Sequence, residues 1–214
     1  MIDKEVSFVK LPIQLDANDW QHDLAKLKNS TAWIAHVNKQ CYQGNWSALA
    51  LTSLQEHVHA HPIMQTFSIE NGKGTWCDLP VLQELPALLK ILRSLPFKYQ
   101  SVRAMHLAPG ASIFPHRDRG LTYSNGCARL HIPLQYSDRV HFMVNDKLMP
   151  MQIGEIWYFN ADQIHSVENQ SDEDRINLVI DCTVNDWLKA VLSGVQTSSS
   201  NTSIEKCIEQ SELL

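Results

Sequence analysis

Hydrophobic and polar residues alternate along the second half of the chain. Short runs rich in β-branched and aromatic residues are separated there by turn signals. These runs are QSVRAMHL, ASIFPH, CARLHIPLQY, VHFMV, EIWYF and RINLVIDCTV. Several short strands at this spacing are typical of an all-β sandwich or barrel. The pattern therefore predicts a β-rich core over residues 99–185.

The first half has a different pattern, in which helical spacing is more common. Ser7–Leu15 is predicted to form a short strand, and Asp19–Lys28 an amphipathic helix capped by Asp16 or Asn18. Leu79–Leu95 is predicted to be helical, because leucines recur there at spacings of three and four with prolines near both ends. We expect these helices to cover one face of a sheet.

Composition and charge limit the class of protein. The 214 residues, with 44% hydrophobic and 19% charged, fit one domain over residues 1–192, in which a mixed helical and β part (1–98) precedes the β core. Residues 193–214 are predicted to be a flexible polar tail with a possible short terminal helix. A net charge of -5 without a basic run argues against nucleic acid, and no apolar stretch is long enough for a membrane helix. Five scattered cysteines without a CxxC pair suit a reducing compartment, so we expect a cytoplasmic protein.

Two short motifs contain candidate metal ligands. On an extended strand, His116 and Asp118 would point to the same face, so they could bind one ion together. His165 is the candidate third ligand, and two histidines with one carboxylate form the facial set that holds non-haem Fe(II). The polar sequence HRDRG is equally compatible with a solvated loop. The alternating histidines of HVHAHP (His57, His59 and His61) are a weaker candidate site, because no carboxylate or cysteine lies beside them.

Alternation also places basic residues on one face of two strands. Arg129 and His131 share a face of CARLHIPL, and Arg175 shares a face of RINLVIDCT with Asn177, Val179 and Asp181. Pro133 is expected to end regular pairing or to lie at an edge. If both polar faces line a barrel, its guanidinium groups need anionic partners, which a dicarboxylate co-substrate would supply. Alternatively, Arg175 could be a surface residue that pairs with Glu173 or Asp174.

Several motifs together resemble one enzyme family. The runs PG(x)4PHxD, RLHIPL and GExWxFxxxxxHxVxN followed by RINLVID are similar to the aspartyl/asparaginyl β-hydroxylase family. This family is a branch of the 2-oxoglutarate- and Fe(II)-dependent oxygenases that includes small bacterial proline hydroxylases. The resemblance covers Val102–Asp181, and GNWSALAL resembles a tryptophan-containing segment upstream. It implies a double-stranded β-helix, that is, a cupin-like jelly roll with flanking helices.

The resemblance also implies roles for individual residues. Iron would be bound by His116, Asp118 and His165. Arg175 would anchor the distal carboxylate of 2-oxoglutarate, His131 would contact its other end, and Arg129 would contact co-substrate or substrate. The implied reaction is hydroxylation of an amino acid or a peptidyl Asp, Asn or Pro-type side chain with O2, giving succinate and CO2.

The substrate is expected to bear a carboxylate, because basic residues are expected near the mouth of the site. The residues expected there are Arg117, Arg119, Tyr123, Asn125 and Trp157. Trp157 also fits a buried core position. Two other functions remain open: a cupin-like metalloenzyme of another class, and a non-catalytic jelly-roll binding protein. Arg175 favours the oxygenase over the first, and the intact ligand set favours it over the second.

Overall fold

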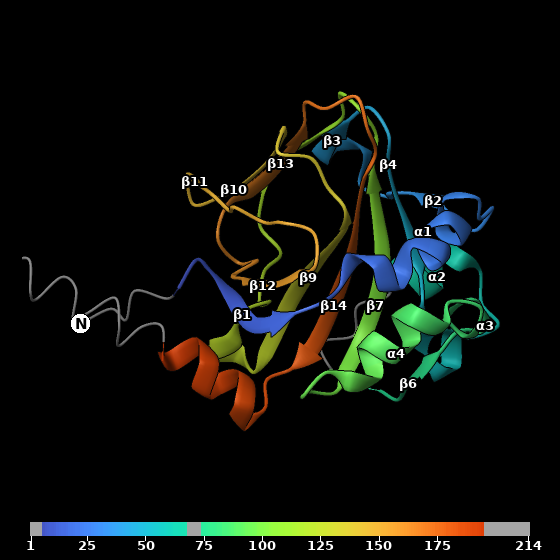
Figure 1. Cartoon of the computed structure of the whole chain (residues 1–214), viewed down its shortest axis with the longest axis horizontal. Coiled ribbons are helices and arrows are strands. Elements are labelled where there is room, and N and C mark those ends of the chain that lie inside the picture. Colours follow the sequence, from blue (N-terminus) through green and yellow to red (C-terminus); the bar gives the residue numbers. More distant parts are fainter. Residues whose placement is uncertain (1–5, 68–73, 195–214) are drawn as a thin grey trace, which may run out of the picture.

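The computed structural model describes residues 6–67 and 74–194, and two antiparallel β-sheets dominate it (Figure 1). The larger sheet has the order β1-β12-β9-β14-β7-β4-β2 and the smaller one β11-β10-β13-β8-β3. The larger sheet comprises β1 (Phe8–Gln14), β12 (Glu155–Phe159), β9 (Cys127–Gln135), β14 (Arg175–Thr183), β7 (Tyr99–Leu107), β4 (Trp46–Ala50) and β2 (Ile34–Ala35). The smaller sheet comprises β11 (Lys147–Leu148), β10 (Val140–Val144), β13 (His165–Asn169), β8 (Ser112–His116) and β3 (Tyr42–Gln43).

The two sheets face each other as a double-stranded β-helix, which confirms the expected jelly roll. A separate two-stranded antiparallel sheet pairs β5 (Thr52–Leu54) with β6 (Trp76–Asp78). Of the predicted polar tail, residues 195–214 lie outside the described residues, and Cys207 lies there with them.

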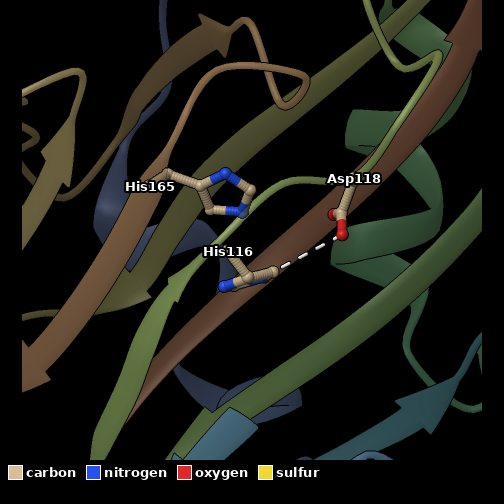
Figure 2. Close-up of side chains that lie close together, drawn as sticks. All are labelled: His116, Asp118 and His165. Carbon is tan, nitrogen blue, oxygen red and sulfur yellow. Dashed lines mark ion pairs between the residues drawn. The ribbon is translucent and has the colours of Figure 1, made fainter.

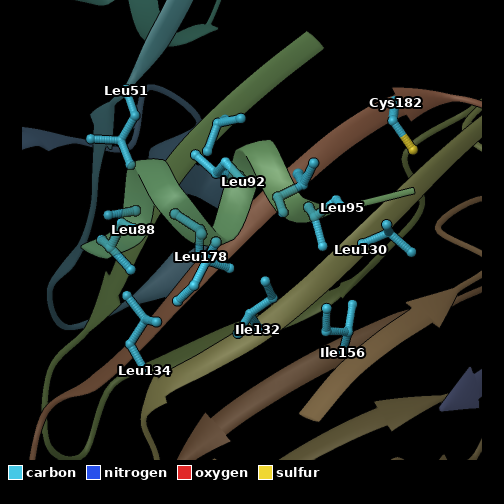
Figure 3. Close-up of a cluster of buried hydrophobic side chains, with 14 of the residues drawn as sticks. Leu51, Leu88, Leu92, Leu95, Leu130, Ile132, Leu134, Ile156, Leu178 and Cys182 are labelled. Carbon is cyan, nitrogen blue, oxygen red and sulfur yellow. The ribbon is translucent and has the colours of Figure 1, made fainter. Parts of the chain in front are cut away.

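Helices cover the outer face of the larger sheet. They are α1 (Gln21–Lys28), α3 (Pro80–Gln83) and α4 (Pro86–Ser94), together with the helical residues 186–194. The short helix α2 (Pro62–Phe67) lies instead on the side that faces the smaller sheet, where Phe67 packs against the apolar cluster between the sheets. Figure 3 shows α4 lying over the sheet with Leu88 and Leu92 directed towards it, and both side chains are almost fully buried. No helix within the described ranges is both long and apolar enough to cross a membrane.

The predicted leucine helix forms as two helices instead of one. The break lies at Leu85, whose backbone angles (φ -117°, ψ 68°) are not helical. A following proline disfavours the helical conformation at the residue before it, and Pro86 follows Leu85. The new N-terminus at Pro86 is capped by a distant residue, because the carboxylate of Asp23 in α1 accepts hydrogen bonds from the amides of Ala87 (2.8 Å) and Leu88 (3.0 Å). A cap of this kind satisfies amides that have no partner inside the helix.

The predicted alternation of β14 is confirmed. The apolar side chains of one face lie in the cluster beneath the helices, with exposures of 0–1%: Ile176, Leu178, Ile180 and Cys182. Val179, on the other face, belongs to a second apolar cluster between the sheets. Trp157 belongs to that second cluster and is 7% exposed, so it is a core residue and not part of a mouth.

Two local expectations concern Pro133 and the HVHAHP histidines. Pro133 lies inside β9, an inner strand and not an edge, but regular pairing does end there: the register with β14 shifts between Ile176 and Asn177, directly after Pro133. A bulge accommodates the missing N–H donor of proline without an edge. The HVHAHP segment is not extended, since His57 ends a 3-10 turn and α2 begins at Pro62. Its histidines therefore do not share one face of a strand.

Candidate functional site

The three candidate metal ligands come together between the sheets. His116 is the last residue of β8 and His165 the first of β13, and the two are direct antiparallel partners. Their ring centroids lie 4.2 Å apart. Asp118 follows in the loop, where its amide donates to the carbonyl of Ala161 at 2.8 Å. Ligand atoms of all three residues lie within 4.8 Å of one another (Figure 2).

The strand ends earlier than the same-face argument assumed. Because β8 stops at His116, strand alternation does not place Asp118. The loop hydrogen bond to Ala161 places it instead. The loop that carries Asp118 is not fully solvated, since the side chains of His116 and Asp118 are 21% and 30% exposed.

Backbone carbonyls set the orientation of both imidazoles. Nδ1 of His116 lies 2.8 Å from the carbonyl of Phe114, and Nδ1 of His165 lies 3.0 Å from the carbonyl of Gln163. A carbonyl can only accept, so each Nδ1 carries the proton of the neutral ring. Nε2 of each ring is left with its lone pair, which is the form that binds metals.

Charges in the site favour the same protonation state. Burial, followed by the neighbouring His116, lowers the pKa of His165 to about 4. Burial alone would raise the pKa of Asp118. The positive charge of Arg129 and the neighbouring His165 lower the pKa by more than burial raises it, so the net pKa is below its usual value. A neutral histidine and an ionised carboxylate are the species that a divalent cation requires.

A cavity of about 240 Å³ opens beside the three ligands. It is lined by residues of both sheets, of the β2–β3 connection, of α2 and of the loop after β8: His36, Val37, Asn38, Cys41, Trp46, Phe67, Arg103, Met105, Ile113, His116, Asp118, Arg129, His131, Phe142, Phe159, His165, Val167, Arg175 and Val179. All six predicted site residues are among them. Of the expected mouth residues, Arg117, Arg119, Tyr123 and Asn125 do not line this cavity.

Arg175 is a buried cation without a carboxylate partner among the described residues. It is 2% exposed, and its Cζ lies 5.7 Å from the Phe142 ring and 6.0 Å from the Tyr136 ring. Asp174 pairs with His106 instead, at 2.8 Å, so the surface-pair alternative is wrong. Burial lowers the pKa of Arg175 to about 10. A guanidinium that is buried without a carboxylate partner favours binding of an anionic ligand.

Asn177 links Arg175 to His131. With the amide oriented as its neighbours require, its oxygen accepts from Nη2 of Arg175 at 2.8 Å and from Nδ1 of His131 at 3.2 Å. The His131 ring packs against Phe142 and Phe159. Burial first, and Arg175 next, hold the pKa of His131 well below its usual range. His131 is therefore neutral, with its Nε2 available as an acceptor.

Arg129, unlike Arg175, is paired with carboxylates. Its Nε and Nη2 donate to the carboxylate of Asp181 at 2.7 and 2.8 Å, and its Nη1 donates to Oδ2 of Asp118. Arg103 donates to the same Asp181 at 2.9 Å. The predicted contact of Arg129 with co-substrate or substrate stays a prediction.

Sequence reasoning did not single out several cavity residues. Arg103 had a detectable signal, since it is a charged residue inside the apolar run QSVRAMHL. His36 had none, because it follows a two-residue strand in an irregular segment. Its ring stacks on Trp46, with centroids 3.5 Å apart and planes at 11°. Burial, then Arg103, lowers the pKa of His36 to about 4.

These histidines predict a pH dependence of stability. The pKa values of His36 and His165 are about 4 in the folded protein, and that of His131 is well below 6.5. The unfolded chain therefore binds more protons below pH 6.5, so this stability is complete above pH 6.5 and is lost as the pH falls towards 4. We expect the metal-free protein to melt at a lower temperature at pH 5 than at pH 7.5, and His36→Phe to reduce the difference. A melting temperature that rises on acidification would contradict this assignment.

Comparison with known sequences gives a family and a relative. The family described as Aspartyl/Asparaginyl beta-hydroxylase matches residues 15–184. An L-proline cis-4-hydroxylase from Rhizobium meliloti (strain 1021) is 26% identical over 194 residues, which cover 86% of this chain and 63% of the relative. The chain thus matches somewhat less than two thirds of that relative's length.

Comparison with solved structures supports the fold. An oxidoreductase of the 2OG-Fe(II) oxygenase family from Burkholderia pseudomallei superposes with a TM-score of 0.51 at 14% identity, over 86% of this chain and 90% of that chain. The non-haem α-ketoglutarate-dependent epimerase SnoN from nogalamycin biosynthesis gives a TM-score of 0.51 at 12% identity, over 84% and 79%. At these identities the likeness concerns the arrangement of strands.

Proposed function

Because this chain belongs to the aspartyl/asparaginyl β-hydroxylase family, we propose that it is a 2-oxoglutarate- and Fe(II)-dependent dioxygenase that hydroxylates an amino acid or a peptidyl Asp, Asn or Pro-type side chain. The observation that carries the proposal is a combination within one cavity. A facial set of two histidines and one carboxylate lies there with a buried guanidinium that lacks a carboxylate partner among the described residues.

His116, Asp118 and His165 would hold the iron. Their donor set suits Fe(II), because two neutral imidazoles and one carboxylate on one side leave other positions open. With 2-oxoglutarate and O2, bound iron would supply oxidative decarboxylation to succinate and CO2 and transfer of one oxygen atom to a C–H bond. The chain itself orients the imidazoles through the carbonyls of Phe114 and Gln163.

Arg175 would bind the distal carboxylate of 2-oxoglutarate. The guanidinium is already desolvated, so a carboxylate that pairs with it gains charge-assisted hydrogen bonds without a further cost of burying the cation. Asn177 and the rings of Phe142 and Tyr136 hold the guanidinium in place. Phe142 and Phe159 also form apolar walls that exclude water.

The charge of the cavity favours a substrate with a carboxylate. Three guanidinium groups (Arg103, Arg129 and Arg175) face two carboxylates (Asp118 and Asp181), which leaves one positive charge among these residues. Adding Fe(II) and the doubly negative 2-oxoglutarate leaves this excess unchanged. The modest volume, about 240 Å³, suits a small molecule or a single side chain.

A turnover assay tests the proposed function. The protein, Fe(II), ascorbate and 2-oxoglutarate are incubated in air with L-proline, the other L-amino acids, and peptides containing Asp, Asn or Pro. We expect succinate to form in proportion to a product heavier by one oxygen atom with at least one of these substrates. Omission of Fe(II) is the control. A complete absence of succinate with every substrate would contradict the proposal.

A further inference from the structure

The two carboxylate oxygens of Asp118 face different partners. Oδ1 lies 3.9 Å from Nε2 of His116, on the side of the other ligands (Figure 2). Oδ2 accepts a hydrogen bond from Nη1 of Arg129. A carboxylate held in this way offers one oxygen to a cation and keeps the other occupied. The arrangement therefore specifies a single-oxygen ligand.

Arg129 is itself fixed from its other edge. Asp181 binds it with both carboxylate oxygens, at 2.7 and 2.8 Å, in the two-pronged geometry that restrains a planar guanidinium most strongly. Arg103 donates to Oδ2 of Asp181 at 2.9 Å, so this carboxylate neutralises two cations. Although burial alone would raise the pKa of Asp181, the two guanidinium groups hold it below its usual value.

The network connects a rigid sheet to a loop. Asp181 in β14 is the direct cross-strand partner of Arg129 in β9, and Arg103 lies in the neighbouring strand β7. Asp118, by contrast, lies beyond the end of β8 in the smaller sheet. The Asp181–Arg129 pair therefore reaches across the cavity to the one metal ligand that no strand holds.

We infer that Asp181 and Arg129 are positioning residues that orient the carboxylate of Asp118 for metal binding. The inference rests on the proposed metal site. Nε, Nη1 and Nη2 of Arg129 each donate to a carboxylate, so its function here is to direct a ligand. Carboxylates behind metal-binding histidines act in the same way, by fixing the geometry of a group that contacts the ion.

Cobalt(II) titration of the metal-free protein tests the inference without turnover. We expect Asp181→Asn to raise the Kd for Co(II) roughly 10- to 100-fold and to alter the visible d–d spectrum, as loss of an outer partner does in other metal sites. Two effects act together, since Arg129 loses its anchor and two guanidinium groups lose their counter-charge beside the cation. In an Arg129→Gln background the same change should have a smaller effect, because the anchoring of Arg129 and its counter-charge no longer matter and only the counter-charge of Arg103 is still removed.

Asp23→Asn is the matched control. Asp23 is also a buried carboxylate, 1% exposed, but it caps α4 and does not line the cavity. This variant should lower the melting temperature and leave the Co(II) Kd and spectrum unchanged. If Asp181→Asn does not fold, Arg129→Lys keeps the charge, lacks the two-pronged geometry, and should still raise the Kd several-fold.

Three results would overturn the inference. One is an Asp181→Asn or Arg129→Lys protein whose Kd is within twofold of wild type with the same spectrum. Another is an effect of Asp181→Asn that is equal in both backgrounds. In either case wild-type Co(II) binding would leave the proposed metal site intact. If wild type itself binds no Co(II), the metal site fails, and the inference fails with it.

Discussion

Replacement of Arg175 by Met is expected to weaken 2-oxoglutarate binding by about 100-fold or more, while the protein without ligand becomes more stable. The loss follows from removing the charge-assisted hydrogen bonds of a desolvated guanidinium, together worth about 3 kcal/mol, and roughly 1.4 kcal/mol is tenfold in affinity. The gain in stability has the same origin. Arg175 is 2% exposed and has no carboxylate partner among the residues described, so an apolar side chain of similar length removes a buried charge.

Two titrations check this prediction. Binding of 2-oxoglutarate is measured with Mn(II) in place of iron, and thermal unfolding is measured without either ligand. Arg139→Met is the matched control, because Arg139 is exposed and pairs with an exposed carboxylate, that of Asp172, at 3.2 Å. It should change neither quantity appreciably. An Arg175→Met protein with wild-type affinity for 2-oxoglutarate would contradict the assignment of Arg175.

Replacement of His165 by Ala is expected to reduce affinity for Fe(II) or Co(II) by more than about 100-fold, which exceeds the effect of outer residues. His165 is one of only two imidazoles in the described cluster, and its Nε2 is the free nitrogen. Metal content after equilibrium dialysis measures the effect directly. Hydroxylation should be lost as well.

His106→Ala is the matched control for this variant. His106 is another histidine of the β-sheets with a carboxylate partner, Asp174 at 2.8 Å, but it does not line the cavity. We expect its removal to cost some stability and to leave metal content at the wild-type level. Equal metal content in wild type and His165→Ala would show that the ion is held elsewhere.

The sequence predicted the faces of β9 and β14 because side chains alternate strictly along a strand. The two-residue period of a strand was enough to place Arg129 and His131 opposite the apolar face of β9, and Arg175 opposite the apolar face of β14. The same reasoning paired His116 with Asp118, whereas His165 was added from the chemistry of a two-histidine, one-carboxylate site and from the resemblance. It did not foresee that Asp118 is held by a loop hydrogen bond, since strand ends are not determined by alternation.

What could not be predicted depends on contacts between distant segments. Asp181 was assigned to the polar face, but its pairing with Arg103 and Arg129 requires the order β9-β14-β7, which local pattern does not contain. His36 lines the cavity from an irregular segment, where neither the helical nor the strand repeat predicts the direction of a side chain. Arg117 and Arg119 were expected at the mouth because they flank His116 and Asp118, yet both are exposed and outside the cavity.

The central claim is that one cavity binds Fe(II) and 2-oxoglutarate together. Anaerobic titration of the metal-free protein with Fe(II) and then 2-oxoglutarate, followed in the visible, tests it most directly. Chelation of iron by the 2-oxo acid produces a metal-to-ligand charge-transfer band. The proposed site predicts that this band appears in wild type, saturates at one equivalent of iron, and is absent from His165→Ala. A wild-type protein that binds both components and shows no such band would contradict the claim.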